Sequence, residues 1–456
     1  MPATVAGVQG RMTALKAVLL AATVLLSLGG IAAATEVDLD RWQRLSTRGV
    51  EQANAGRLEE AEESLRAAYM LASGLRETDP RRATTANNLG FVLHASGRPE
   101  AAIPLYEEAL RLREAALGPE HPAVAQSLNN LAEALRALGR AAEALPLHRR
   151  ALAIRRTSLG AGHPETAQSL NNLSVLLGGL GEQVEAQALA GEALKVRVEA
   201  FGPDHPSVAE TRANLAALAY GRGDMAEAER LYRDVLAAEE RRLGPDAPAL
   251  ALTISNLAQT LSRQQRAAEA LPLFERALAI RTGQVGEESL AAAQSRRDLA
   301  GTAAETGDLE RARALLEASL ATQERLLGQE DPALAATLTD LAEVHRRQGD
   351  LDEAAPLLAR ALATEERQGE ETPGLATMLN NLAALHYRRG AYRDALPLLA
   401  RALRLEEQAH GPDYPELAVT LDNYAAVLTE LARPAEAEAA RHRADAIRLT
   451  QARRAP

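Results

Sequence analysis

A spacing of 42 residues recurs along most of this 456-residue chain, and it limits the possible fold more than any other feature does. A proline opens each unit, at Pro80, Pro122, Pro164, Pro206, Pro248, Pro332, Pro373 and Pro415. An Asn-Leu pair and then a glycine follow in the same order, as in Asn130-Leu131 and Gly139. A repeat of this length indicates supersecondary units that stack on one another, so it decides the fold class before any single motif can.

The unit from Pro122 to Gly160 predicts two amphipathic helices around a short turn. In its first half, Val124, Leu128, Leu131 and Leu135 recur at spacings of three and four residues, which places them on one face of a helix. Its second half, about Ala141 to Leu159, carries a similar apolar face. Ordering 42 residues costs roughly 40–80 kcal/mol of backbone entropy, at about 1–2 kcal/mol each. One hairpin buries too little to offset that cost, so stacked neighbours must share the stability.

The unit resembles the tetratricopeptide repeat. The resemblance rests on Asn130-Leu131-Ala132, the turn at Gly139, Glu143-Ala144 and Ala151-Leu152. Its 42-residue length and the loop Leu117-Gly118-Pro119-Glu120-His121-Pro122 are similar to the kinesin light chain type of this repeat. The resemblance implies an all-α fold, a right-handed superhelical solenoid of about ten helix-turn-helix repeats. It also implies that the first helix of each repeat lines the concave face.

Four parts of the chain follow from these landmarks: a leader at 1–34, a degenerate helix pair at 35–76, the repeat array at 77–433, and a capping helix with a tail at 434–456. In the leader, Arg11 and Lys16 precede an apolar run, and Ala32-Ala33-Ala34 fits an A-x-A cleavage site, which predicts a signal peptide. An uncleaved membrane anchor is the alternative, because the apolar stretch is at the lower limit for spanning a bilayer. We therefore expect an exported, periplasmic protein, with inner-membrane anchoring as the alternative.

Composition and motifs exclude several classes of function. The net charge of −11 argues against a nucleic-acid partner, which requires a basic surface. The chain has no cysteine, so disulfides and thiol chemistry are excluded. We find no phosphate-binding loop, zinc-protease motif or nucleophile elbow in the sequence. His121, His163 and His205 each precede a proline in successive repeats, which favours a structural repeat feature over a metal site. We therefore predict no catalytic residue, no metal and no cofactor.

The remaining signal is a row of asparagines at one position of the first helices. Asparagine is a mediocre helix former, so its return at one position needs a reason. One interpretation is that each amide binds a neighbouring helix and fixes the spacing of the layers. The other is that the amides donate to and accept from the backbone of a bound peptide, as the family resemblance implies. Both interpretations stay open, and the row comprises Asn87, Asn88, Asn129, Asn130, Asn171, Asn172, Asn214, Asn256, Asn380, Asn381 and Asn423.

Further groove residues are predicted one helical turn from the asparagine row. They are Gln126, Glu133, Arg136, Gln168, Glu210, Tyr220, Gln259, Arg263, Arg346, Tyr387 and Arg388. Arg346, Arg347 and Arg388 could select an acidic side chain, whereas Asp298 and Asp340 interrupt the row and could favour a basic one. From the row and these neighbours we choose Arg136, Arg346 and Arg388, with all of the asparagines except Asn423, as the predicted peptide-binding set.

These features predict a non-catalytic scaffold that binds an extended peptide or protein segment on its concave face. The alternative is a structural or assembly component that is anchored at a membrane or associates with itself. The expected partner is a protein or peptide, contact with a membrane depends on an uncleaved leader, and a monomer is favoured.

Overall fold

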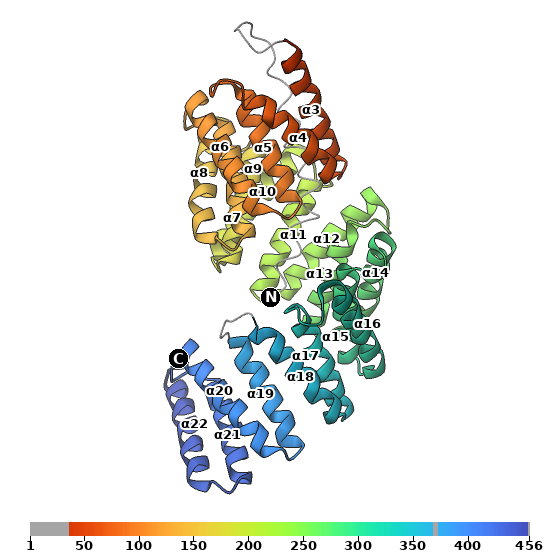
Figure 1. Ribbon diagram of the computed structural model, residues 1–456, viewed down its shortest axis with the longest axis vertical. Helices are drawn as coiled ribbons and strands as arrows, with labels where there is room; N and C mark the ends of the chain where they lie inside the picture. Colours follow the sequence, from red (N-terminus) through yellow and green to blue (C-terminus); the bar gives the residue numbers. More distant parts are fainter. Residues whose placement is uncertain (1–35, 368–372, 455–456) are drawn as a thin grey trace. The chain divides into compact units, whose positions relative to one another are not determined.

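The computed structural model describes residues 36–367 and 373–454, and these residues form helices joined by short turns (Figure 1). No strand occurs in these ranges, which confirms the all-α prediction. The helices come in pairs, so we call the odd-numbered helices, from α3 on, first helices and the even-numbered ones second helices. The predicted leader at 1–34 lies outside the described residues.

The helices form two compact units, one up to Thr260 and one from Leu261, and the boundary falls inside α13 (Leu250–Arg263). Unit 1 contains α3 (Glu36–Asn54), α4 (Leu58–Ala72), α5 (Pro80–Ala95), α6 (Pro99–Leu117), α7 (Pro122–Ala137), α8 (Ala141–Leu159), α9 (Pro164–Gly179), α10 (Gln183–Phe201), α11 (Pro206–Gly221) and α12 (Met225–Leu243). Unit 2 contains α14 (Ala267–Val285), α15 (Leu290–Glu305), α16 (Leu309–Leu327), α17 (Leu334–Gln348), α18 (Leu351–Glu366), α19 (Pro373–Arg388), α20 (Tyr392–His410), α21 (Leu417–Glu430) and α22 (Pro434–Arg454).

Consecutive helices pack on one another within each unit, and some first helices of neighbouring pairs also touch, such as α5 with α7 and α15 with α17. Small residues permit this close approach: Ala102, Ala144 and Ala186 recur at one position of successive second helices and are fully buried. Leucines of the first helices, such as Leu128 and Leu170, are also fully buried and fill the spaces between packed helices. No helix in the described ranges is long and apolar enough to cross a membrane.

Histidine caps begin three of the first helices. The Nδ1 atoms of His121, His163 and His205 accept hydrogen bonds from the backbone N–H groups of Ala123, Glu165 and Ser207, at 3.1, 3.2 and 3.2 Å. Each bond satisfies one of the amide groups that a helix start leaves without a partner. These three histidines therefore have the structural role that their repeat position predicts.

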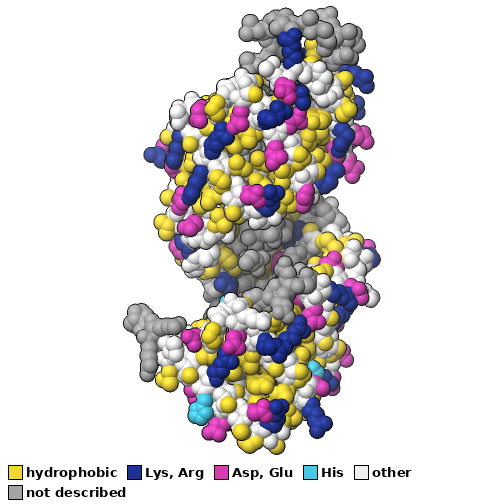
Figure 2. Space-filling model, turned by 60° about the vertical axis from the view of Figure 1, so that its left-hand side comes forward, with side chains coloured by type: hydrophobic (Ala, Val, Ile, Leu, Met, Phe, Trp, Pro, Cys, Tyr) yellow, Lys and Arg dark blue, Asp and Glu magenta, His cyan; other side chains and the backbone are white. Residues whose placement is uncertain are grey.

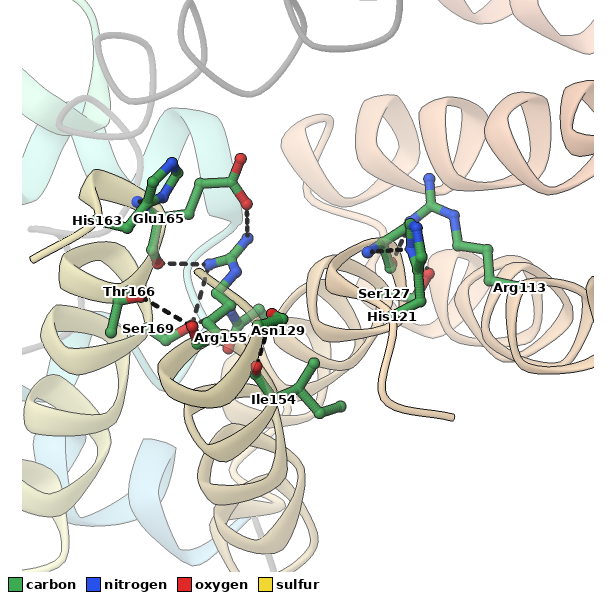
Figure 3. Close-up of polar contacts among 12 residues, drawn as sticks. Arg113, His121, Ser127, Asn129, Ile154, Arg155, His163, Glu165, Thr166 and Ser169 are labelled. Carbon is green, nitrogen blue, oxygen red and sulfur yellow. Dashed lines mark hydrogen bonds and ion pairs between the residues drawn. The ribbon is translucent and has the colours of Figure 1, made fainter. Parts of the chain in front are cut away.

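Buried arginines join three second helices of unit 1, α6, α8 and α10, to the next first helix. Arg155 of α8 is 3 % exposed, and its Nη1 donates to the Glu165 carbonyl at 2.9 Å and to Ser169 Oγ at 3.0 Å, both on α9 (Figure 3). Arg113 makes the same contacts with Ala123 and Ser127 of α7, and Arg197 repeats them with α11. Burial lowers the pKa of Arg113 to about 10. The three arginines share one repeat position, but their spacing alone does not predict this connection.

The turns between paired helices need a left-handed residue, and two described turns in unit 2 have a residue other than glycine there, Gln265 and Ala432. Gly139 and Gly307 have φ values of +74° and +90° at the turn position, whereas Gln265 occupies the equivalent position with φ +61°. A side chain in this conformation costs roughly 1–2 kcal/mol. Gln265 is thus a strained position beside the boundary of the two units.

Replacing Gln265 by glycine should therefore raise the free energy of unfolding of unit 2. The released strain exceeds the extra entropy of glycine, about 0.5–1 kcal/mol, so we expect a net gain of about 0.5–1 kcal/mol. Urea unfolding of the full chain, with hydrogen exchange at α14, measures it. Gly307→Gln is the reverse control and should cost a similar amount. A lower midpoint for Gln265→Gly would contradict the explanation.

Candidate functional site

The asparagine row forms a series of paired positions along the first helices. We call the two adjacent residues at this position of each first helix the doublet; examples are Asn129-Asn130 in α7 and Thr339-Asp340 in α17. The first residue of one doublet faces the second residue of the next. Where both are asparagine, the amides can bond directly: Asn130 Nδ2 donates to Asn87 Oδ1 at 2.9 Å. Asn214 bonds Asn171 and Asn423 bonds Asn380 in the same way, each at 3.0 Å. We call such a contact a bridge.

The bridges give part of the predicted binding set a structural role. Asn87, Asn129 and Asn171 are buried, and each uses its amide to hold a neighbouring helix. Asn88 is buried as well. Asn130, Asn214 and Asn380 are half-buried and engaged in bridges. The interpretation that the asparagines fix layer spacing therefore holds for the bridged members, and the peptide-binding interpretation stays a prediction for the others.

Three doublet positions remain open: their second asparagine is half-buried or exposed and has no amide partner among the described residues. Asn256 faces Ala213, which has no polar side chain. Asn381 faces Thr339, whose hydroxyl instead donates to the Ala335 carbonyl at 2.8 Å. Asn172 faces Asn129, whose amide is bonded elsewhere. These are the positions where an asparagine of the row can still bind another molecule.

A hollow of about 330 Å³ lies at the open position between α17 and α19. Three residues of the predicted binding set line it: Arg346, Asn381 and Arg388. The rest of the lining is Thr339, Ala342, Glu343, Leu358, Ala384 and Leu385. Because Thr339 does not bridge to Asn381, the amide of Asn381 is left facing this space. The hollow is the place in unit 2 where the predicted residues converge.

The two arginines of the hollow differ in their partners. Arg346 forms a double hydrogen bond with Glu343, with Nε and Nη2 each 2.6 Å from a carboxylate oxygen, and this bond raises the pKa of Arg346. Arg388 is exposed and makes no ion pair with any described residue. The position three residues before it, where Glu343 precedes Arg346, is occupied by Leu385. The hollow therefore contains one neutralised and one available cation.

The acidic doublet residues have a different arrangement. Arg297 of α15 bridges to Asp340 of α17, with Nε donating to Oδ2 at 2.9 Å, in place of an asparagine pair. Asp298 accepts from Gln294 Nε2 at 2.8 Å. Burial raises the pKa of both aspartates, against the opposing charge of Arg297. At Asp340, where an aspartate replaces the asparagine of the row, an ion pair with Arg297 therefore takes the place of the amide bridge.

Three predicted groove residues of unit 1, Glu133, Arg136 and Glu210, make polar contacts with described residues. Glu133 pairs with Arg136 of the same helix, Nη2 to Oε2 at 2.9 Å, and His148 Nε2 of α8 lies 3.3 Å from Glu133 Oε1. Although burial opposes ionisation, the close polar contact with His148 and the charges of Arg136 and His148 hold the pKa of Glu133 well below its usual range. Glu210, another predicted groove residue, accepts from Asn171 Nδ2 at 3.1 Å instead of facing open space.

Charges of both signs are interspersed over the face drawn in Figure 2, where Lys and Arg side chains alternate with Asp and Glu.

No group of three His, Asp or Glu side chains in the described part of the chain is arranged to hold a metal ion. A site made of amides, one ion pair and one available arginine suits a hydrogen-bonding polymer such as a peptide.

A family model described as the tetratricopeptide repeat matches the chain over residues 49–366, in overlapping segments, and again over 374–441. The chain belongs to the tetratricopeptide-repeat family. No curated protein sequence matches it. The match confirms the family predicted from the asparagine, glycine and alanine landmarks, and it indicates a protein-interaction scaffold.

Solved structures with this repeat fold resemble the chain. The TPR-like repeats of a putative kinesin light chain from P. anserina are 25 % identical, with 45 % of this chain and 98 % of that one covered, at a TM-score of 0.40. BtubC (BKLC) from P. vanneervenii is 27 % identical over 51 % of this chain and 92 % of that one, at 0.44. The apo form of the quorum sensor NprR from B. thuringiensis is 15 % identical over 81 % and 98 %, at 0.57, and shows the shared fold.

Proposed function

We propose that this tetratricopeptide-repeat protein is a non-catalytic scaffold that binds an extended peptide or protein segment along its first helices. The hollow between α17 and α19 would hold an acidic residue of that segment. The observation that carries the proposal is the open doublet position there, which leaves the Asn381 amide without a partner among the described residues, beside the available Arg388. The proposal also retains export by the leader at 1–34, which rests on the sequence alone.

The chemistry of the hollow supports a peptide over a small apolar ligand. An asparagine amide both donates and accepts, so it can bind the N–H and C=O groups of an extended main chain. A guanidinium binds a carboxylate through two parallel hydrogen bonds. Arg388 supplies that group, because Arg346 is already bound to Glu343. Leu358 and Leu385 add an apolar floor that can hold the aliphatic part of the same side chain.

A peptide-display experiment tests this proposal. Random decapeptides would be selected on the full chain, and their affinities measured for the wild type, Asn381→Ala and Arg388→Glu. We expect acidic residues to be enriched, and each substitution to weaken binding at least tenfold, which is about 1.4 kcal/mol. Replacing the critical acidic residue of a peptide by lysine should restore its binding to Arg388→Glu only.

Arg404→Glu is the matched control, because it makes the same charge change at an exposed position of second helix α20. It should leave the affinity within about twofold. Peptides that bind all three variants equally, with helix content preserved by circular dichroism, would exclude the hollow. Concentration-dependent association measured by light scattering, without any selected peptide, would instead favour the assembly role.

A further inference from the structure

The first helices contain two Glu-x-x-Arg sequences that begin three residues after the doublet: Glu133–Arg136 in α7 and Glu343–Arg346 in α17. They lie five 42-residue repeats apart, one in each unit. Both are followed by an open doublet position, at Asn129/Asn172 in unit 1 and Thr339/Asn381 in unit 2. The Asn129/Asn172 position of unit 1 is thus the repeat equivalent of the Thr339/Asn381 position beside the hollow in unit 2. The two positions are open for different reasons.

His148 keeps the unit 1 position open. Asn129 Nδ2 donates to Ser169 Oγ at 2.8 Å, so Asn129 Oδ1 is the acceptor for His148 Nδ1 at 2.9 Å. Both ends of the Asn129 amide are therefore occupied, and neither reaches Asn172. Repeats with a closed bridge have Tyr106, Ala190 or Leu399 at the position of His148, and Leu358 occupies it in the unit 2 hollow. Among the described repeats, His148 is the only histidine at that position.

His148 also changes the charge that this position presents. Its side chain is fully buried, and Nε2 lies 3.3 Å from Glu133 Oε1 without a well-aligned hydrogen bond. The side chains of Glu133 and Arg136 are 23 % and 27 % exposed, against 50 % and 41 % for Glu343 and Arg346. Gly179 occupies the position of Arg388. The open position in unit 1 therefore has no described counterpart of Arg388. Its Glu133–Arg136 ion pair is less exposed than the Glu343–Arg346 pair of unit 2.

We infer that unit 1 carries a second ligand site at the open Asn129/Asn172 position, which binds the main chain of an extended peptide without requiring an acidic side chain. This inference rests on the proposed function, since it assumes that open doublet positions bind peptide. The half-buried Asn172 amide makes the contact, because no described residue occupies its donors or its acceptor. The protein then binds two segments, one selected for an acidic residue in unit 2 and one held mainly by its backbone in unit 1.

The test uses the full chain with its unit 2 hollow disabled by Asn381→Ala and Arg388→Glu together. Random decapeptides selected on this variant should still bind, without enrichment of acidic residues. Adding Asn172→Ala should weaken their binding at least tenfold. Asn214→Ala is the matched control, because Asn214 occupies the same position in α11 but is engaged in a bridge, and it should change the affinity less than threefold. Titration calorimetry should show one peptide fewer for each chain in Asn172→Ala than in the wild type.

His148→Leu provides an independent measurement. It frees Asn129 to bridge to Asn172, as Asn171 does to Asn214, so peptide binding in unit 1 should fall while exchange of the Asn172 side-chain amide hydrogens slows.

If the variant with the disabled hollow selects no peptide although the wild type does, the second site is absent and the proposed function stands. If the wild type selects none, both fail. Peptide binding to the variant that is insensitive to Asn172→Ala places the second site elsewhere and overturns the inference.

Discussion

Replacing Arg155 by alanine should lower the free energy of unfolding of unit 1 by about 3 kcal/mol. The substitution removes two hydrogen bonds to α9, at 2.9 and 3.0 Å, and empties the space of a side chain that is 3 % exposed. Lost hydrogen bonds of a charged group cost about 1.5–3 kcal/mol each in gross terms, and the cavity adds to this. Ser169 keeps its bond from Asn129, which limits the loss. Urea unfolding monitored by hydrogen exchange in α8 and α9 measures the change.

Arg156 is the matched control, since it is the neighbouring arginine and points to the surface. It pairs with Glu192 at 2.7 Å while its side chain is 42 % exposed, so Arg156→Ala should cost less than about 0.5 kcal/mol. Arg155→Met retains most of the buried volume and isolates the polar contribution; we expect a loss between those of the two alanine variants. Equal effects of Arg155→Ala and Arg156→Ala would show that the buried contact does not hold α8 to α9.

The periodicity of the sequence was sufficient to predict the paired helices, because each helix is determined by apolar residues within its own turn and by local start and stop signals. The second helix predicted from about Ala141 to Leu159 matches α8 at both ends. The division inside α13 was not predictable in this way. The boundary lies close in sequence to the turn where Gln265 replaces glycine, and the 42-residue period and the apolar pattern of a single helix do not indicate it.

The candidate site was predictable in position but not in detail. The asparagine row marked one face of the first helices, yet the same residue type bridges helices at Asn214 and is open at Asn381. The difference is set by the facing residue one repeat earlier, Asn171 or Thr339. For Asn172 it is set by His148, which acts through Asn129 from another helix. A comparison of each doublet with the preceding one distinguishes Asn214 from Asn381 in the sequence. The state of Asn172 could not be predicted in this way, because it depends on how α8 packs against α7.

Glu133→Gln should destabilise unit 1 by about 2 kcal/mol at pH 7, because it removes the carboxylate that Arg136 and His148 share. Hydrogen bonds to charged groups typically contribute about 1.5–3 kcal/mol. The repeat-equivalent Glu343→Gln is the matched control. Glu343 has Arg346 as its partner and is 50 % exposed, so solvent screens the pair and the expected cost is under about 0.5 kcal/mol. Urea midpoints of both variants, followed by hydrogen exchange in α7 and α17, measure the two costs.

The effect of Glu133→Gln should depend on pH in one direction. The pKa of Glu133 is lowered on folding from an unfolded value near 4.5, so its contribution is fully present above that pH and is lost as the pH falls through the lower folded pKa. The difference in unfolding free energy between wild type and variant should therefore shrink below about pH 4.5 and be constant from pH 5.5 to 7. A difference that grows on acidification would mean that the charge of Glu133 is a cost to the fold. In that case His148 and Arg136 would not stabilise the carboxylate in the folded state.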